Sequence, residues 1–326
     1  IFVIILLSFA CYFFSTIKII PFLFIGIFLL RLSGQGLMSH TATTTISRYF
    51  EKTRGKALSV TWLGLSAAEF ILPVLMVFLL TLISWRQIWF YISLLVLIFL
   101  PIVSFLLIKK LQLDSREKSI KNEKKEINNI KQWTRSEVLK DYRFYIISLN
   151  MLSMPSIATG VFVYQSFIVN SKNWGPFIMA QSFMVYSVLS VITLTLSGFL
   201  IDKYTSRKLL VFMNIPLFLA AIVLFLFDNP LSSFVFLGLI GITNGFANVL
   251  GSSTWAEIYG VKYIGGIKAL TTGLMVFATA AGTAIFGILI DAGYSINIIA
   301  IFSSIYIAII VLLLFIFIKK IEPIYI

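Results

Sequence analysis

Long apolar runs are the feature that most constrains how this chain can fold. Ten stretches are almost wholly apolar, and all but the first have the roughly 20 residues that a helix needs to cross a bilayer. Charged residues make up only 12% of the chain, against about 25% in soluble domains. These runs exclude a soluble fold and predict an all-α polytopic membrane protein. The expected segments are residues 1–14, 19–46, 56–84, 87–109, 142–168, 176–201, 207–227, 231–255, 264–290 and 294–318.

The first run is too short to span a bilayer, and the chain starts inside it. Ile1 is not a Met, and no basic residues precede the run, as they would in a signal peptide. We therefore expect an N-terminal truncation.

The basic residues fall almost entirely on one side of the expected helices. Of the 26 Lys and Arg residues, Lys18, Arg86 and Lys172 lie in the loops of one side, Arg31 lies inside a helix, and the other 22 lie in the loops of the opposite side. Basic loops stay in the cytoplasm, so we expect the long linker and the C-terminal end to be cytoplasmic. The net charge of +13 is then an orientation signal, and we expect no nucleic-acid partner.

A polar stretch divides the expected helices into two groups. Residues 110–141 mix charges of both signs with Ser and Asn, which is typical of a solvated linker; an amphipathic surface helix is the alternative. We expect an incomplete N-terminal bundle of four helices at 1–109, a cytoplasmic linker at 110–141 and a C-terminal bundle of six helices at 142–326. Two equal halves would need two more helices at the start, and the truncation accounts for their absence.

The two groups share weak repeats. Arg54-Gly-Lys-Ala-Leu58 opens the third segment, and Gly265-Gly-Ile-Lys-Ala-Leu270 opens the ninth in the same way. Each follows a polar helix that contains glycines, at residues 31–36 and 241–245. The repeats are six helices apart, which is an even number, so the halves run parallel, as in one known transporter architecture.

The loop after the sixth segment carries a family signature. It reads Gly198-Phe-Leu-Ile-Asp202-Lys-Tyr-Thr-Ser-Arg207-Lys208. This pattern resembles the cytoplasmic signature of the major facilitator superfamily, and Arg54-Gly55 and Ser84-Trp85-Arg86 also resemble that family. The resemblance covers the whole chain and implies two six-helix bundles, of which the first two helices are missing here.

The same resemblance implies a secondary transporter that moves a small organic solute by alternating access. We expect charged residues at the cytoplasmic helix ends to hold the inward side closed in one state. The gating candidates are Asp202, Lys203, Arg207 and Arg54. Residues 255–260, which read Trp-Ala-Glu-Ile-Tyr-Gly, and residues 265–270 are similar to the oxalate/formate antiporter and monocarboxylate porter branch. That similarity makes an organic anion such as a monocarboxylate a candidate solute.

Two charged residues lie near the middle of consecutive expected helices. A charge at the bilayer centre costs about 2.5–3.5 kcal/mol on insertion scales, so Arg31 and Glu69 each need a reason to be there. They are expected to be close together. The pair could be a structural ion pair that locks two helices, or it could be an anion site with a proton-linked carboxylate.

Polar side chains also repeat at helical spacing on the expected helices. They form stripes at Ser182, Tyr186, Ser190, Thr193 and Ser197, at Asn244, Asn248 and Ser252, and at Thr272, Thr279 and Thr283. Close packing through small residues is one explanation. It accounts less well for large polar groups, which favour a central cavity. The solute-binding candidates are Arg31, Gln35, Glu69, Tyr186, Asn244 and Asn248.

We expect neither an enzyme nor a bound cofactor or metal. The single cysteine and single histidine cannot form a metal-binding pair, and no Gly-rich phosphate loop is present. The expected partners are a small-molecule solute, the lipid bilayer and protons as a candidate coupling ion, with the protein a monomer in a bacterial inner membrane. The alternative function is a non-transporting sensor or scaffold with the same fold.

Overall fold

The structure is a computed structural model that describes residues 2–39, 41, 42, 45, 54–111, 131–260 and 262–324. The described residues are almost entirely helical and contain no strand. The chain divides into two compact units. Unit 1 is Ile1–Leu65 with Leu75–Glu126, and unit 2 is Ser66–Val74 with Ile127–Ile326. Most of the expected linker, residues 112–130, lies outside the described residues.

The expected membrane segments are confirmed as helices. Nine helical stretches among the described residues are long and apolar enough to cross a membrane, and Phe2–Thr16 is a shorter apolar helix. Large apolar side chains face outward on these helices, among them Phe105 and Phe315 at 67% and 65% exposure. Such exposure is unusual for a soluble surface and fits contact with lipid. The chain is therefore an all-α polytopic membrane protein.

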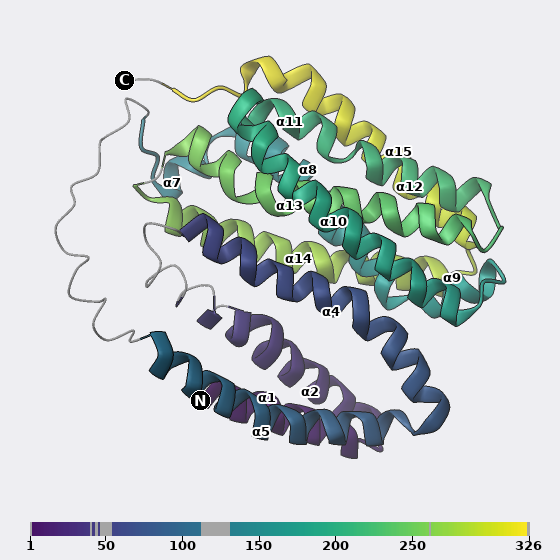
Figure 1. The fold of residues 1–326 in the computed structure, drawn as a ribbon. Coiled ribbons are helices and arrows are strands. Elements are labelled where there is room, and N and C mark those ends of the chain that lie inside the picture. Colours follow the sequence, from purple (N-terminus) through teal and green to yellow (C-terminus); the bar gives the residue numbers. More distant parts are fainter. Residues whose placement is uncertain are drawn as a thin grey trace. The chain divides into compact units, whose positions relative to one another are not determined.

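Unit 1 contains helices α1 (Phe2–Thr16), α2 (Ile20–Leu30), η1 (Arg31–Met38) and α5 (Trp85–Leu111), with parts of α4 (Arg54–Leu82). Helices α1 and α5 lie side by side (Figure 1). The Ser8 hydroxyl donates to the Ser93 carbonyl across this contact at 2.9 Å, and the Phe14 ring packs edge-on against Trp89. Helix α2 continues into η1, where the backbone widens to π-helical geometry at Arg31.

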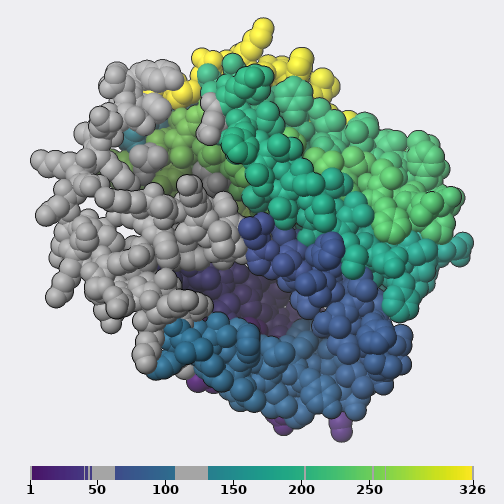
Figure 2. Space-filling view, viewed as in Figure 1, coloured from purple at the N-terminus to yellow at the C-terminus, as the bar shows by residue number. Residues whose placement is uncertain are grey.

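Unit 2 holds the six helical segments expected after the linker. They are α8 (Tyr142–Val163) with α9 (Gln165–Ser171), α10 (Pro176–Tyr204), α11 (Ser206–Met213) with α12 (Ile215–Leu226), α13 (Ser232–Tyr259), α14 (Ile264–Asp291) and α15 (Ile296–Phe317). Side chains of the teal and green segments α10 to α13 fill much of the visible face of unit 2 (Figure 2). The short helices α7 (Arg135–Val138) and η4 (Ile318–Lys320) flank α8 and α15 in the chain.

Two expected segments of unit 2 are interrupted helices. Helix α8 ends at Val163 and α9 begins at Gln165, while α11 ends at Met213 before Asn214 and Pro216. Pro216 has no N–H to continue the helical hydrogen bonds. The Asn214 amide donates instead to the carbonyl and the side-chain oxygen of Asn150 in α8, at 2.7 and 2.9 Å. Both asparagines are fully buried, so the break is stabilised inside the bundle.

Glycine allows α10 and α13 to cross at very short distance. A Cβ atom on Gly241 would lie 2.2 Å from the Tyr186 carbonyl oxygen, and one on Gly245 would lie 2.5 Å from that of Ser190. Neither position tolerates a side chain without moving a backbone. Small residues at such crossings are typical of membrane helices, because dispersion contacts replace the hydrophobic effect there.

The last part of the expected linker is packed onto unit 2 and differs from a solvated chain. The Trp133 side chain is buried and packs edge-on against Tyr259, and its backbone N–H donates to the Tyr259 carbonyl at 3.0 Å. Thr134 and Glu137 form a capping box at the start of α7. In the described part of the linker, the chain is therefore tied to the bundle from residue 131 onward.

Candidate functional site

Arg31 lies in unit 1 at the point where the helix widens. Its Nη1 donates to the Gln35 side-chain oxygen at 2.6 Å, and both side chains are exposed. The spacing of four residues places the two side chains on one helix face. Because the acceptor is an uncharged amide, this hydrogen bond does not neutralise the guanidinium. Widened turns of this kind occur often at functional sites.

Glu69 lies in the part of α4 that belongs to unit 2. Its side chain is partly buried, and Oε2 is a buried atom with no hydrogen-bond partner among the described residues. Four residues later, Pro73 lacks the N–H that would normally bond the Glu69 carbonyl. A buried polar atom without a partner is unfavourable by about 1–3 kcal/mol. This carboxylate is therefore available for a proton, a cation or a solute donor.

Tyr186 of α10 is a buried solute-binding candidate of unit 2. The Tyr186 side chain is 2% exposed and interacts electrostatically with Glu69. Its ring packs edge-on against Phe162 of α8, with ring centroids 5.6 Å apart. Next to it, the Ser187 hydroxyl donates to the Ser66 carbonyl, one turn before Glu69 on α4. Helix α10 therefore positions this stretch of α4.

The asparagines of α13 differ from each other. The Asn244 amide donates to the Ser190 hydroxyl of α10 at 2.9 Å, whereas Asn248, one turn along, is exposed. The stripe of α10 that includes Ser190 is buried at the crossing with α13, and Ser182 shares a 2.6 Å hydrogen bond with Ser233 there. The structure thus assigns most of this stripe to helix packing. Asn248 is the asparagine that remains open to a solute.

The structure places the expected site residues in two groups. Glu69, Tyr186, Asn244 and Asn248 belong to unit 2, and Arg31 and Gln35 belong to unit 1. The pairing of Arg31 with Glu69 stays a prediction, because the two residues lie in different units.

Two of the gating candidates, Lys203 and Arg207, lie at the end of unit 2 that carries the linker. We call this end the linker face; it comprises residues 131–141, 203–208, 257–260, 262–264 and 318–324. Arg207 Nε lies 3.5 Å from Glu257 Oε1, and Arg207 Nη1 lies 3.0 Å from Glu322 Oε1. Glu257 also accepts hydrogen bonds from the backbone N–H and the hydroxyl of Ser206, at the start of α11.

The other gating candidates are described only in part. The Lys203 Nζ lies 5.2 Å from the centre of the Tyr204 ring. The side chains of Asp202 and Arg54 lie outside the described residues.

Sequence reasoning missed the two carboxylates that hold Arg207. Glu257 lies within the motif at residues 255–260, and its position at the end of an apolar helix was the available signal. Glu322 follows Lys319 and Lys320, and nothing in the local pattern distinguishes it from an ordinary charged end. A buried ion pair lies nearby, where Arg143 binds Asp141 with Nη2 2.7 Å from Oδ2.

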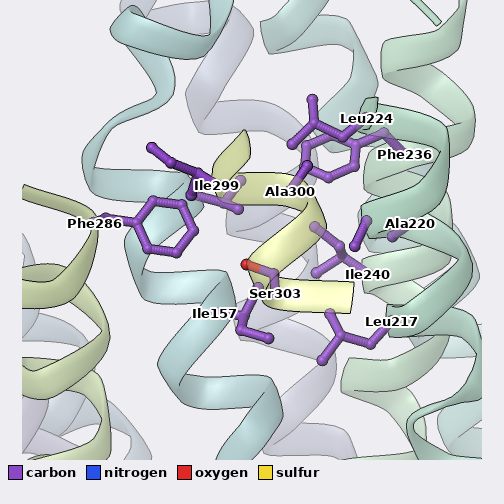
Figure 3. Close-up of a pocket in the computed structure, with 12 residues that line it drawn as sticks. Ile157, Leu217, Ala220, Leu224, Phe236, Ile240, Phe286, Ile299, Ala300 and Ser303 are labelled. Atoms are coloured by element: carbon purple, nitrogen blue, oxygen red, sulfur yellow. The ribbon is translucent and has the colours of Figure 1, made fainter. Parts of the chain in front are cut away.

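The cavity found inside unit 2 is not suited to a solute. It is lined by α8, α12, α13, α14 and α15, and the lining side chains are apolar apart from Ser303 (Figure 3). Its volume is about 10 Å³, which is at the lower limit for one water molecule. Among the described residues, no group of three His, Cys, Asp or Glu side chains could hold a metal ion.

Comparison with known families assigns the chain to one protein family. The family model of the Major Facilitator Superfamily matches residues 1–272 of the 326. The match is to the superfamily and does not favour the oxalate/formate and monocarboxylate branch. No curated protein matches the chain. The members of this family are membrane transporters that bind small-molecule solutes. The chain therefore belongs to the major facilitator superfamily and is a membrane transporter of that superfamily.

Proposed function

We propose that this protein is a secondary active transporter that moves a small organic anion together with a proton by alternating access. The observation that carries the proposal is that neither Arg31 nor Glu69 is bonded to a group of opposite charge among the described residues. Arg31 is bonded to the uncharged Gln35, and Glu69 has a buried oxygen for which the described part of the chain offers no hydrogen-bond partner. In helices that only pack against one another, such groups would be neutralised or absent.

Arg31 and Gln35 form the contact for the anion. A guanidinium binds a carboxylate through two parallel hydrogen bonds, which are stronger than hydrogen bonds between neutral groups. The Gln35 amide adds a donor at its side. On unit 2, the exposed Asn248, the Glu69 carboxylate and Tyr186 supply further polar contacts, and Asn244 supports them through Ser190. A monocarboxylate matches the single positive charge of this set.

Glu69 is the proton acceptor in this mechanism. While Arg31 is free, its positive charge favours the ionised carboxylate. When an anionic solute occupies Arg31, that support is lost and Glu69 takes up a proton, because a buried unpaired charge is unfavourable. The solute and the proton then move together, and their combined charge is zero. Two residues are sufficient for this coupling.

Charged groups at the cytoplasmic helix ends form the gate. Asp202, Lys203, Arg207 and Arg54 hold the inward side closed in one conformation and release it in the other. The support for this role is that Arg207 is engaged by two carboxylates, Glu257 and Glu322, from separate segments. A residue with several alternative acidic partners can exchange them as the helices move.

The linker and the C-terminal end lie in the cytoplasm, and the protein is a monomer of the bacterial inner membrane. The support for the orientation is the 22 basic residues on one side against three on the other. Side-specific reporters fused within residues 112–130 and after Lys320 test this. A periplasmic signal from either fusion would overturn the orientation.

Reconstitution into proteoliposomes tests the function. Uptake of a panel of small organic acids is measured with and without an imposed pH gradient. We expect accumulation of at least one monocarboxylate to follow the gradient in the wild type and to vanish in Arg31→Gln. Binding of the acid without any translocation would instead identify a sensor with the same fold.

A further inference from the structure

The segment that follows α15 packs against the rest of the linker face of unit 2. Ile321 is fully buried and Pro323 is buried beside it. The Ile324 carbonyl accepts a 2.8 Å hydrogen bond from the Lys131 backbone N–H. Residues 321–324 therefore bind Lys131, the first described residue of the linker. We call residues 131–134 the linker end.

Glu322 makes two different contacts from this segment. Its peptide carbonyl accepts a hydrogen bond from Arg143 Nη1 at 2.6 Å, and its carboxylate Oε1 lies 3.0 Å from Arg207 Nη1. Arg143 is almost fully buried and is neutralised by Asp141. The Glu322 side chain is 64% exposed, so water screens its ion pair. The backbone contact and the burial of Ile321 therefore hold the segment, and the carboxylate positions Arg207.

The opposite edge of the linker end is held by the loop between α13 and α14. The Gln132 side-chain oxygen accepts from the Lys262 backbone N–H at 2.9 Å. Gly260 makes this possible, because its φ is +79° and a Cβ there would lie 2.4 Å from that oxygen. The linker end thus lies between residues 321–324 on one side and the α13–α14 loop on the other.

We propose that residues 321–324 are a clasp that ties the linker end to the gating residue Arg207, with Glu322 as a positioning residue. A displacement of the linker is transmitted through the Lys131–Ile324 hydrogen bond to Glu322 and from there to Arg207. Glu322 and Glu257 together fix where the guanidinium lies. The gating part of this inference rests on the proposed function, whereas the clasp itself rests on the contacts alone.

Limited proteolysis tests the clasp without any transport measurement. The full chain in lipid nanodiscs is digested with trypsin, and cleavage after Lys131 and Arg135 is followed by mass spectrometry. Ile321→Ala removes the buried side chain that holds the segment, so we expect cleavage about threefold faster than in the wild type, from a larger locally open fraction. The matched control is Ile324→Ala, which shortens an exposed side chain of the same segment and keeps the carbonyl that binds Lys131. Equal rates in Ile321→Ala and Ile324→Ala would overturn the clasp.

Transport by a set of four proteins tests the positioning role. Uptake is compared for wild type, Arg207→Gln, Glu322→Gln and the double variant. If Glu322 acts through Arg207, the double variant should match Arg207→Gln within about twofold, because interacting residues are not additive. Independent, multiplying losses would overturn the positioning role. If the wild type shows no transport, the proposed function fails, and the proteolysis still decides the clasp.

Discussion

Replacing Glu69 and Arg31 together separates a structural pair from a transport site. The perturbation is Glu69→Leu with Arg31→Leu, which puts apolar side chains at both positions. Glu69 has one buried oxygen that forms no hydrogen bond with any residue that the structure describes. Removing it should raise the free energy of unfolding by about 1–3 kcal/mol. Arg31 is exposed and bonded to Gln35, and losing such a pair costs about 0.2–0.5 kcal/mol. The double variant should therefore be at least as stable as the wild type.

Transport should behave in the opposite way. Without the guanidinium the anion loses its charged contact, and without the carboxylate the proton has no acceptor, so we expect uptake to fall by about 100-fold, as for truncation of a desolvated charge pair. The assay measures three quantities on the same preparation: membrane abundance, the thermal melting temperature in detergent, and proton-driven uptake in proteoliposomes. Matched single variants show which residue carries each effect.

Two results would refute the reasoning. Retained uptake in the double variant would show that Arg31 and Glu69 are not the transport site. A lower melting temperature in Glu69→Leu alone, restored by adding Arg31→Leu, would show that the residues are a structural ion pair.

Three further predictions concern other parts of the chain. Hydrogen bonds from the Thr134 backbone and hydroxyl lower the pKa of Glu137 from 4.5 to about 2, so its support of α7 should be complete above pH 4.5 and disappear as the pH falls towards 2. The protection factor of the Thr134 amide, which is its exchange rate relative to the intrinsic rate at the same pH, should fall over this range and stay constant in Glu137→Gln. Gly241→Ala should lower the free energy of unfolding by about 1–3 kcal/mol through overpacking, measured by thermal melting, whereas Gly251→Ala, with nothing within 4 Å of its added Cβ, should be neutral or slightly stabilising; equal effects would contradict the close α10–α13 crossing. Asp202→Asn should reduce uptake while membrane abundance stays near normal, and full uptake would show that the signature loop only sets topology.

The membrane helices could be predicted from sequence because their length and composition are local properties. Each of the ten apolar runs is helical in the described residues, with ends that differ by a few residues and with breaks at Tyr164 and Asn214 in two of the runs. The helix break at Asn214 was harder to predict from the sequence. Pro216 signals a local disturbance, but the partner that stabilises the break is Asn150, which lies in a different helix. A tertiary contact of this kind leaves no periodic pattern.

The candidate site could be predicted only as a set of residue types. Embedded Arg31 and Glu69 stand out because charges are rare in apolar runs, and helical spacing identified the stripe on α10. The spacing could not distinguish a cavity wall from a buried crossing, and only the approach of Gly241 and Gly245 shows that most of that stripe faces α13. The contacts of Glu322 and of the packed linker end could not be predicted for a similar reason. A polar segment has the composition of a solvated chain, and only its tertiary contacts show that it is packed.

The π-helical stretch at Arg31–Met38 has a consequence for register. A π-helical turn holds one more residue than an α-helical turn does, since its hydrogen bonds reach from residue i to i+5. If one such turn tightened to α geometry, Ser39, Thr41 and Ala42, the described residues that continue the helix beyond Met38, would rotate by about 100° and shift by about 1.5 Å along the axis. Each side chain there would then face the neighbour that the adjacent residue faces now. The helix can thus present a different row of side chains downstream while Arg31 and the residues before it stay in place.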